Sequence, residues 1–503
     1  MHIAFLNPQG NFDAKDSYWT EHPDFGGQLV YVKQVALAMA ALGHTVDIIT
    51  RQIVDPKWPE FATPFDRYPE VEHVRIVRLP AGPPEFLRKE LLWEHLVREW
   101  VPRILEFFRT KGPRPDAITT HYGDGGLCGV LLEAETGIPF TFTGHSLGAQ
   151  KLDKLHPTQE TLAGIDAQYF FSRRLAAERL SMNRSAVNIT STRQERFEQY
   201  GHPAYHGAVT VDDERRFAVI PPGVNLMTFG KEARYVGEVV AQAHVRAMFA
   251  RDLAEGRREL PAIIASSRLD PKKNHLALVQ AFAQSPALQA AANLVIFTGA
   301  LDDPLRDDAN CSPGERAVLA DIRKVIAEHN LGGKVSAFAV QGQPALAASY
   351  RLLAQRPGSV FALTALYEPF GLAPLEAAAA GLPLVVTRNG GPSESLFEAG
   401  IEYGVLVDPA DPTDIARGLE RLVLDAAAWE QFARLGRQRV LDRYTWERTA
   451  EGYLRVIEEI VADPGARRPA ELLPLPAHFC NPDEGDEELL AALRELIAAP
   501  GVA

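Results

Sequence analysis

Short apolar runs alternate with longer helical stretches along most of the chain. The run HIAFLNP (2–8) is typical of a buried strand, and residues 29–44 have helical spacing that stops at Gly43. Strand runs return at 45–51, 72–80, 116–123, 138–146 and 186–192, with helical stretches such as 91–112 between them. Because strands and helices take turns, the pattern predicts a parallel sheet covered by helices on both faces.

A second series of the same kind follows a Pro/Gly passage, IPPGVNLMTFG (220–230). Its strand runs lie at 261–270, 292–300, 334–340, 359–365, 382–391 and 403–409. We therefore expect an α/β chain with two Rossmann-like, doubly wound domains. The second domain would span 223–447, and the first would combine 1–222 with 448–503, to which the helical run at 447–463 returns. Two such sheets would place their strand ends at one central cleft, where ligands bind.

The composition is that of a soluble globular enzyme, with 46% apolar and 23% charged residues. The 52 basic and 65 acidic residues give a net charge of −13, so neither nucleic acid nor an anionic membrane is an expected partner. Any anionic ligand must be held by a local basic cluster. Three scattered cysteines match no metal or CxxC spacing, and the opening MHIAFLNPQG has no basic leader, so a cytoplasmic protein is expected.

Two loops carry residues suited to phosphate. Gly26 and Gly27 precede the first long helix, where paired glycines let a phosphate approach the helix N-terminus. The alternative is a loop that needs positive φ. In SSRLDPKKN, Arg268 and Lys273 follow a strand and can converge on one diphosphate. Their alternative is a solvated basic loop, but the strand-end position favours function.

The segment YEPFGLAPLEAAAAGLP is the most specific motif. Pro374 suits the first turn of a helix that ends near Gly381, so N–H groups at Gly371 and Leu372 would form an anion site. Glu368 before the helix and Glu376 inside it can accept hydrogen bonds from sugar hydroxyls. RNGGPSES (388–395) is a further glycine turn expected at the same edge.

The segment GHSLG (144–148) supports two opposed interpretations. It satisfies GxSxG, so Ser146 could be the nucleophile of a serine hydrolase. Alternatively, His145 and Ser146 face the cleft as hydrogen-bonding groups, with Lys151 one turn beyond this segment. A second sheet series and the absence of an HGGG-type loop before the serine favour the latter.

Taken together, GGQ, RLDPKKN and the Glu368/Glu376 segment resemble retaining glycosyltransferases of the GT-B fold. GHSLGAQK (144–151), the arginine pair in YFFSRRLAAER (169–179), STRQERF (191–197), VIPPGVN (219–225) and TRNGGPSE (387–394) resemble the sucrose-phosphate synthases, relatives of sucrose synthase and of glycogen synthase-like enzymes. The similarity covers roughly residues 1–460. The chain resembles the minimal bacterial form, which is expected to have neither the N-terminal extension nor the phosphatase-like domain of plant enzymes.

The resemblance implies transfer of glucose from UDP-glucose to fructose 6-phosphate, giving sucrose 6-phosphate and UDP. It implies that four residues act in catalysis: His145, Glu368, Arg268 and Lys273. It implies donor binding by Gly27, Arg268, Lys273, Gly371, Leu372 and Glu376. It implies acceptor binding by Gln28, Lys89, Tyr122, Ser146, Lys151, Arg173 and Arg174, with the choice among Arg173, Arg174 and Arg179 open.

No carboxylate pair for a double displacement is evident, so the β-phosphate of UDP would leave on the face where the acceptor arrives. We expect no tightly bound cofactor, no metal site, a monomer, and a sucrose-phosphate phosphatase as partner. Four alternatives remain: another donor such as GDP-mannose, free fructose as acceptor, a hydrolase built on Ser146, and a non-catalytic sugar-phosphate sensor. Donor and acceptor assays separate them.

Overall fold

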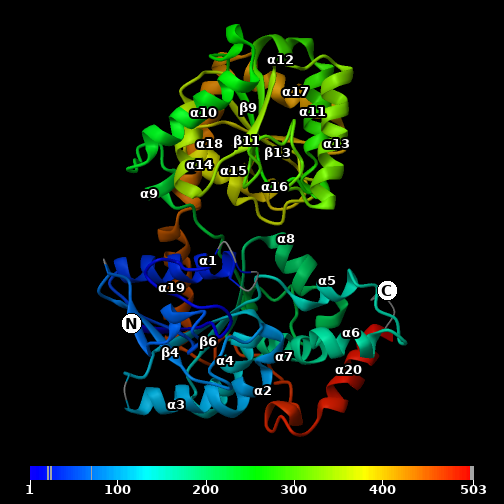
Figure 1. Ribbon diagram of the computed structural model, residues 1–503. Coiled ribbons are helices and arrows are strands. Elements are labelled where there is room, and N and C mark those ends of the chain that lie inside the picture. Colours follow the sequence, from blue (N-terminus) through cyan, green and yellow to red (C-terminus); the bar gives the residue numbers. More distant parts are fainter. Residues whose placement is uncertain (20–21, 23–24, 70, 111, 499–503) are drawn as a thin grey trace. The chain divides into compact units, whose positions relative to one another are not determined.

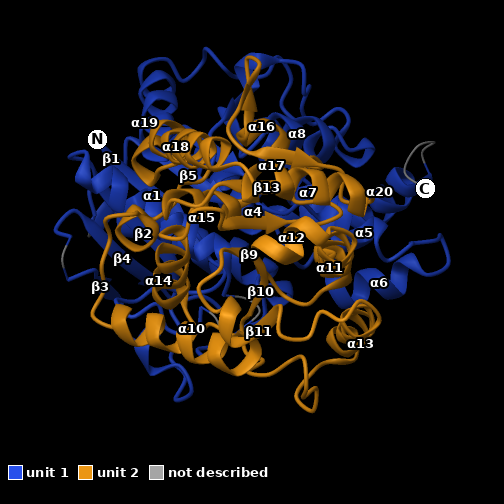
Figure 2. Ribbon diagram, turned by 90° about the horizontal axis from the view of Figure 1, so that it is seen from above, with its two compact units in different colours: residues 1–221, 449–503 blue, residues 222–448 orange. Residues whose placement is uncertain are grey.

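A computed structural model describes residues 1–19, 22, 25–69, 71–110 and 112–498 (Figure 1). The chain divides into two compact units (Figure 2). Unit 1 is Met1–Pro221 with Thr449–Ala503, and unit 2 is Pro222–Arg448. The chain passes from one unit to the other after Pro221 and again after Arg448, and each position lies one residue from the boundary expected from the sequence. Of the helices described, none has the length and apolar character needed to cross a membrane.

The sheet of unit 1 is parallel except at one edge, where β3 runs antiparallel to β4. In spatial order its strands are β3 (Phe65–Arg67), β4 (Val74–Leu79), β2 (Thr45–Arg51), β1 (His2–Leu6), β5 (Ala117–His121), β6 (Phe140–Thr143), β7 (Val187–Thr190) and β8 (Phe217–Val219). All five residues of β1 are buried, as a strand covered on both faces requires. Its helices are α1 (Gly27–Ala41), α2 (Trp93–His95), α3 (Val101–Thr110), α4 (Tyr122–Thr136), α5 (Gly148–Asp153), α6 (Leu162–Tyr169), α7 (Phe171–Arg184), α8 (Arg193–Glu195) and α20 (Asp486–Ala498).

The main sheet of unit 2 is parallel throughout. Its strand order is β11 (Val335–Ala339), β10 (Asn293–Thr298), β9 (Ala262–Ser266), β12 (Val360–Leu363), β13 (Leu384–Thr387) and β16 (Val405–Val407), and β14 (Phe397–Glu398) with β15 (Ile401–Glu402) form a small hairpin. Its helices are α9 (Leu226–Phe229), α10 (Glu238–Asp252), α11 (His275–Gln284), α12 (Pro286–Ala291), α13 (Pro313–Glu328), α14 (Gln343–Ala354), α15 (Leu372–Ala379), α16 (Pro392–Ser395), α17 (Pro412–Val423) and α18 (Ala426–Arg443). Alternate residues of β9 enter two different cores, Ile263 on one face and Ile264 on the other. The two-sided burial explains why the strands read as continuous apolar runs.

Helix α19 (Trp446–Ala462) carries the chain back into unit 1, as the sequence predicts. Its Tyr453 hydroxyl lies 3.0 Å from that of Tyr31 and 2.7 Å from Thr143 Oγ1. At the point of return, Thr449 Oγ1 donates to the carbonyl of Pro221 at 2.8 Å. The chain therefore leaves and re-enters unit 1 at one place.

Two kinds of feature differ from the sequence prediction. β3, β8 and the β14–β15 hairpin were not expected, because strands of two or three residues are too short to show a period. The expected continuous helix at 91–112 is interrupted by a π turn at Leu96–Trp100. Pro102 has no N–H for the carbonyl of Arg98, so the backbone widens just before it. Residue 111 of that predicted helix and residue 499 of the tail helix lie outside the described residues.

Candidate active site

The expected site residues gather where the strand order of each sheet reverses. β1 lies between β2 and β5 in unit 1, and β9 lies between β10 and β12 in unit 2. Ligands bind in the crevice outside the carboxyl ends of strands at such a switch point. Arg268 and Lys273 follow β9, Glu368 follows β12, and His121 ends β5.

In unit 2, the loops after β9 and β12 are joined by an ion pair. Lys273 Nζ lies 2.7 Å from Glu368 Oε2. The backbones are joined as well, since Leu366 N donates to Lys272 O at 2.9 Å. The ammonium and the carboxylate are thus held together at the switch point.

The glycine turn at 388–391 fixes the backbone of Glu368. Glu368 N donates to Asn389 O at 3.1 Å, and Gly391 N donates to Glu368 O at 3.0 Å. Gly390 has φ +100°, and a Cβ there would fall 2.1 Å from the Glu368 carbonyl oxygen. Only glycine permits this approach. The turn that the sequence placed at the same edge therefore supports the loop that carries Glu368.

Gly390→Ala is expected to lower the free energy of unfolding by about 1–3 kcal/mol, because it adds a disfavoured φ and a clash with Glu368. Gly400→Ala is the matched control, since Gly400 has φ +82° but open space around its Cβ position. Denaturant unfolding compares the two variants. Equal destabilisation by both would contradict the close approach at Gly390.

Helix α15 begins after Gly371, which has φ +93°, and Pro374 lies in its first turn, as predicted. Glu376 lies in the second turn and is half-buried. Burial raises the pKa of Glu376 to about 7, and within the described part of the chain its carboxylate accepts no hydrogen bond. A desolvated, unpartnered carboxylate beside a helix N-terminus is suited to accept hydrogen bonds from a ligand's hydroxyls.

Arg268 is exposed, unlike Lys273. Its carbonyl oxygen lies 3.2 Å from His275 Nε2, which also contacts Ser267 Oγ at 3.0 Å. No described residue accepts a hydrogen bond from the guanidinium of Arg268. The backbone is fixed while the cation is left for an anionic ligand.

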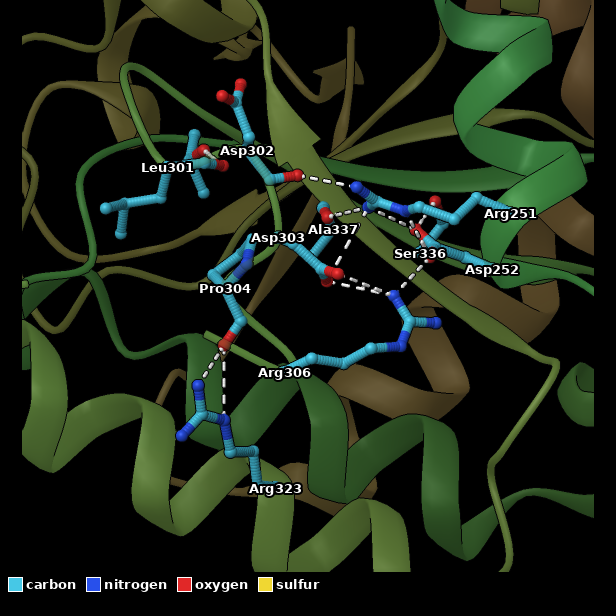
Figure 3. A network of polar contacts seen from close by, with 11 residues as sticks. Arg251, Asp252, Leu301, Asp302, Asp303, Pro304, Arg306, Arg323, Ser336 and Ala337 are labelled. Carbon is cyan, nitrogen blue, oxygen red and sulfur yellow. Dashed lines mark hydrogen bonds and ion pairs between the residues drawn. The ribbon is translucent and has the colours of Figure 1, made fainter. Parts of the chain in front are cut away.

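The loop after β10 is fixed by a charge network that the sequence did not reveal (Figure 3). Buried Asp252 accepts hydrogen bonds from Arg251 at 2.8 Å, Arg306 at 2.9 Å and Ser336 at 2.8 Å. Burial alone raises the pKa of Asp252, but these donors hold it below its ordinary value. Arg306 also reaches Asp303 of the same loop at 2.9 Å, and its contact with Asp252 ties the loop to the end of α10.

In unit 1, Gly27 is the first residue of α1 and Gln28 follows it. Neither Gly26 nor Gly27 has positive φ, so the alternative of a strained glycine loop is wrong. A Cβ at Gly27 would meet no atom of the described residues within 4 Å. Gln28 is buried and points back to the loop after β1, with Nε2 3.3 Å from Asn7 Oδ1.

Near this strand end lies a cavity of about 130 Å³ that brings together four of the expected acceptor residues: Lys89, Tyr122, Lys151 and Arg174. The other lining residues are Gln9, Glu90, Trp93, Gly123, Asp124 and Tyr169. Tyr122 begins α4 with φ +61°, a conformation that a tyrosine holds only when its surroundings enforce it. Gln28 and Ser146 are not among the lining residues.

Buried Glu178 positions two of the cations. Its carboxylate accepts from Gly148 N at the start of α5 at 3.0 Å and from Arg174 Nε at 2.9 Å. Because α5 carries Lys151, one carboxylate places both Lys151 and Arg174. Although burial lowers the pKa of Arg174, the charge of Glu178 and its hydrogen bond hold it above the ordinary value.

The cations of the cavity repel one another. Burial lowers the pKa of Lys151 to about 8, and the charges of Arg174 and Lys89 add to the effect. Burial also raises the pKa of Asp124 to about 6. Lys89 has a partner in Glu90 at 3.3 Å. A dianionic ligand would relieve the repulsion around Lys151, as a phosphate site requires.

The structure does not bring Arg173 to this cavity. Its guanidinium pairs with Asp486 of α20 at 2.9 Å. Arg179 donates to the carbonyls of Ala204 and His206 at 2.6 and 2.9 Å. Of the three arginines between which the sequence left the choice open, only Arg174 lines the cavity.

His145 follows β6 with φ +54°, and its Nε2 lies 2.9 Å from His121 Nδ1. Burial lowers the pKa of His145 to about 4 and takes the pKa of His121 well below its ordinary value, so both rings are neutral at pH 7. The rings of Tyr31 and Tyr122 lie 4.9 and 5.4 Å from that of His145. His145 is therefore held as a neutral hydrogen-bonding group.

Ser146 does not have the environment of a hydrolase nucleophile. In the GxSxG elbow the serine itself occupies the strained turn, whereas here His145 does. The Ser146 hydroxyl makes no hydrogen bond to any histidine that the structure describes, and His202 is paired with Asp153 at 2.9 Å. The Ser146 carbonyl accepts from Arg174 instead. This geometry favours the transfer interpretation of GHSLG.

Sequence reasoning missed several residues of these sites. His121 and Asp124 lie in the segment THYGDGG (120–126), in which only Tyr122 was expected to bind a ligand. They could have been found from their position at the end of a predicted strand. Glu178 could have been found from its i,i+4 spacing to Arg174. Trp93 and Tyr169 had no signal, because they come from segments far apart in sequence.

Comparisons with known proteins agree with this arrangement. Residues 26–209 match the family described as Glycosyl transferase 4-like domain, and residues 254–439 match Glycosyl transferases group 1. Each match lies within one unit. Two solved structures share the fold: sucrose-phosphate synthase from Thermosynechococcus elongatus (26% identity, TM-score 0.62, covering 92% of this chain and 99% of that one) and Anabaena HepE in complex with UDP (16%, TM-score 0.59, 91% and 100%). The expected GT-B fold is confirmed.

Among known sequences, a probable sucrose-phosphate synthase of Thermosipho melanesiensis is 41% identical over 460 residues, which are 91% of this chain and 97% of the relative. The sucrose-phosphate synthase of Zea mays is 33% identical over 512 residues, which are 90% of this chain and 47% of the relative. The chain thus spans about half the length of that plant relative. The resemblance inferred from the motifs is confirmed: the chain belongs to the sucrose-phosphate synthase family of glycosyltransferases.

Proposed function

We propose that this enzyme transfers glucose from UDP-glucose to fructose 6-phosphate with retention of configuration, giving sucrose 6-phosphate and UDP. The cavity of unit 1 carries the proposal. In a chain of net charge −13, it gathers Lys89, Lys151 and Arg174 around a volume of about 130 Å³. A sugar phosphate needs such a basic cluster to bind its negative charge, whereas a neutral sugar does not.

On the donor side, Arg268 and Lys273 bind the diphosphate together with the N–H groups at Gly371 and Leu372, and Gly27 approaches a donor phosphate. Glu376 accepts from the ribose hydroxyls and Glu368 from those of the glucosyl group. These roles are supported by the guanidinium of Arg268 and the carboxylate of Glu376, neither of which has a hydrogen-bond partner in the part of the chain that the structure describes. His145 contacts the glucosyl group.

In the proposed reaction, the bond between the anomeric carbon and the β-phosphate oxygen breaks as the bond to the acceptor hydroxyl oxygen forms on the same face. The acceptor's proton passes to the leaving phosphate oxygen. Arg268 and Lys273 stabilise the negative charge that the leaving group gains. The protein contributes positioning and charge rather than a covalent intermediate or a divalent ion.

An assay of two donors against two acceptors tests the proposal. UDP-glucose and GDP-mannose are each incubated with fructose 6-phosphate and with fructose, and nucleotide release and disaccharide are measured. Activity with UDP-glucose and fructose 6-phosphate alone supports the proposal. A preference for GDP-mannose would show that the proposed donor is wrong, and a preference for free fructose would show that the proposed acceptor is wrong. If no pair is turned over, the result supports the non-catalytic sugar-phosphate sensor.

Ser146→Ala is expected to keep turnover within about tenfold of the wild type, because the contact made by Ser146 to Arg174 is through its carbonyl. Initial rates of UDP release measure this. Loss of all activity, together with labelling of the wild type by a serine-reactive phosphonate, would support the hydrolase instead.

Fructose 6-phosphate binding is expected to weaken as pH rises above about 8. The pKa of Lys151 is lowered to about 8 in the free protein, and the dianion binds the charged form better. The KM for fructose 6-phosphate should rise by up to about tenfold per pH unit above that point. In Lys151→Arg the rise should disappear, and a persistent rise would contradict the role of Lys151.

A further inference from the structure

His121 is a buried histidine, and only one of its two nitrogens has a partner among the described residues. Its side chain is enclosed at the end of β5, where it pairs in register with Thr143, two residues before His145. Nδ1 of His121 lies 2.9 Å from Nε2 of His145. Nε2 of His121 is enclosed and has no hydrogen-bond partner within the described residues. The two imidazoles thus share one hydrogen bond.

The position of the shared proton decides which nitrogen of His145 can donate. If His121 donates from Nδ1, its enclosed Nε2 is an unprotonated acceptor, and His145 carries its proton on Nδ1. If His145 donates from Nε2, then His121 carries its proton on Nε2 as an enclosed, unsatisfied N–H. In folded proteins, a buried N–H group without an acceptor is rarer than a buried acceptor without a donor. The first arrangement is therefore favoured.

His145 has its other nitrogen available. Nδ1 of His145 makes no hydrogen bond to the described residues, and it is not among the enclosed unpartnered atoms. The ring cannot turn freely, because Tyr31 packs edge-on at 4.9 Å and the Tyr31 hydroxyl is tied to Tyr453. A fixed ring with one accessible nitrogen is an oriented donor or acceptor, depending only on the tautomer.

We propose that His121 is a positioning residue that donates from Nδ1 to His145 Nε2 and so keeps the proton of His145 on Nδ1. Nδ1–H is then directed at an oxygen of the transferred hexosyl group. The identity of that ligand rests on the proposed function, whereas the tautomer does not. The competing explanation is that His121 only fills space against Phe5, whose ring lies 5.6 Å away at 13°.

Two substitutions separate these explanations. His121→Phe keeps an aromatic ring against Phe5 but removes the N–H and the unsatisfied nitrogen. His121→Asn places an amide N–H where Nδ1–H was. We expect the thermal stability of His121→Phe to stay close to that of the wild type, because the ring still packs against Phe5, and the loss of the unpartnered Nε2 of His121 offsets the loss of the partner of His145 Nε2.

We expect kcat of His121→Phe to fall about 10- to 100-fold, a loss typical of removing a partner that orients a functional histidine. The KM for fructose 6-phosphate should be unchanged. His121→Asn should restore most of kcat. Equal kcat in the two variants, or an undiminished kcat in His121→Phe, would overturn the positioning role.

The tautomer is measured directly in the full-length wild type by NMR with ¹⁵N-labelled histidine. The His145 signals are assigned from their absence in His145→Asn. A protonated Nδ1 on His145, lost from the majority form in His121→Phe, supports the proposal, and a protonated Nε2 in the wild type overturns it. If no donor and acceptor pair is turned over, the proposed function fails, but the spectra still decide the tautomer.

Discussion

Glu368→Ala is expected to lower kcat at least about 100-fold while the protein stays folded, as for loss of a charged contact made in the transition state. Lys273 and the 388–391 turn hold Glu368 at the β12 strand end. In the proposed reaction its carboxylate accepts from a glucosyl hydroxyl whose acidity increases as the anomeric carbon becomes positive. Initial rates at saturating substrates measure the loss.

Glu368→Gln and Glu430→Gln complete the comparison. The first keeps the shape but not the charge and should lose most of the activity as well. The second changes an exposed glutamate of α18 and should match the wild type. Circular dichroism and thermal unfolding check that each variant is folded. Near-normal turnover in a folded Glu368→Ala protein would contradict the role assigned to Glu368 in the reaction.

The double variant Lys89→Ala/Lys151→Ala is expected to raise the KM for fructose 6-phosphate by about two orders of magnitude or more. Each charge-assisted contact to a phosphate contributes roughly 1.5–3 kcal/mol. The KM for UDP-glucose should change little, because the side chains assigned to the diphosphate and ribose, Arg268, Lys273 and Glu376, lie in unit 2. Arg174 is left in place, since its removal would strand buried Glu178 without its ion-pair partner.

Arg173→Ala is the matched control for the lysine pair. It removes a cation from the same helix as Arg174, but from a side chain that pairs with Asp486 and does not line the cavity. Its KM for fructose 6-phosphate should stay near the wild-type value. An equal rise of KM for both substrates in the double variant would contradict the acceptor assignment, as would equal use of free fructose by the wild type.

The fold was predictable because both sheets are buried on two faces, so each strand appears as an apolar run between helices. Strand ends then located Arg268, Lys273 and Glu368 without any knowledge of three-dimensional structure. The choice between Arg173 and Arg174 could not be made this way. The two side chains leave their helix about 100° apart, and only the packing of α5 and α20 shows which faces the cavity.

The electrostatic properties of the site were also beyond sequence reasoning. Three of these properties depend on distance and burial: Glu376 has no partner among the described residues, Lys151 lies near two other cations, and His121 shares a hydrogen bond with His145. Each depends on neighbours contributed by other elements. The loop after β10 is a similar case, because the residues around Asp252 come from α10, β11 and the loop itself.

The hydrogen bond between Thr449 and Pro221 has a consequence for the order in which the molecule is built. During synthesis the ribosome releases the N-terminal residues of unit 1 first, then all of unit 2, and only afterwards α19. Until then, Tyr31 and Thr143 lack the Tyr453 hydroxyl that joins them. The domain that starts first is therefore finished last, and premature termination near residue 448 would yield a complete unit 2 beside an unfinished unit 1. Because the two ends meet, a short linker from Pro221 to Thr449 would allow unit 1 to be made without unit 2.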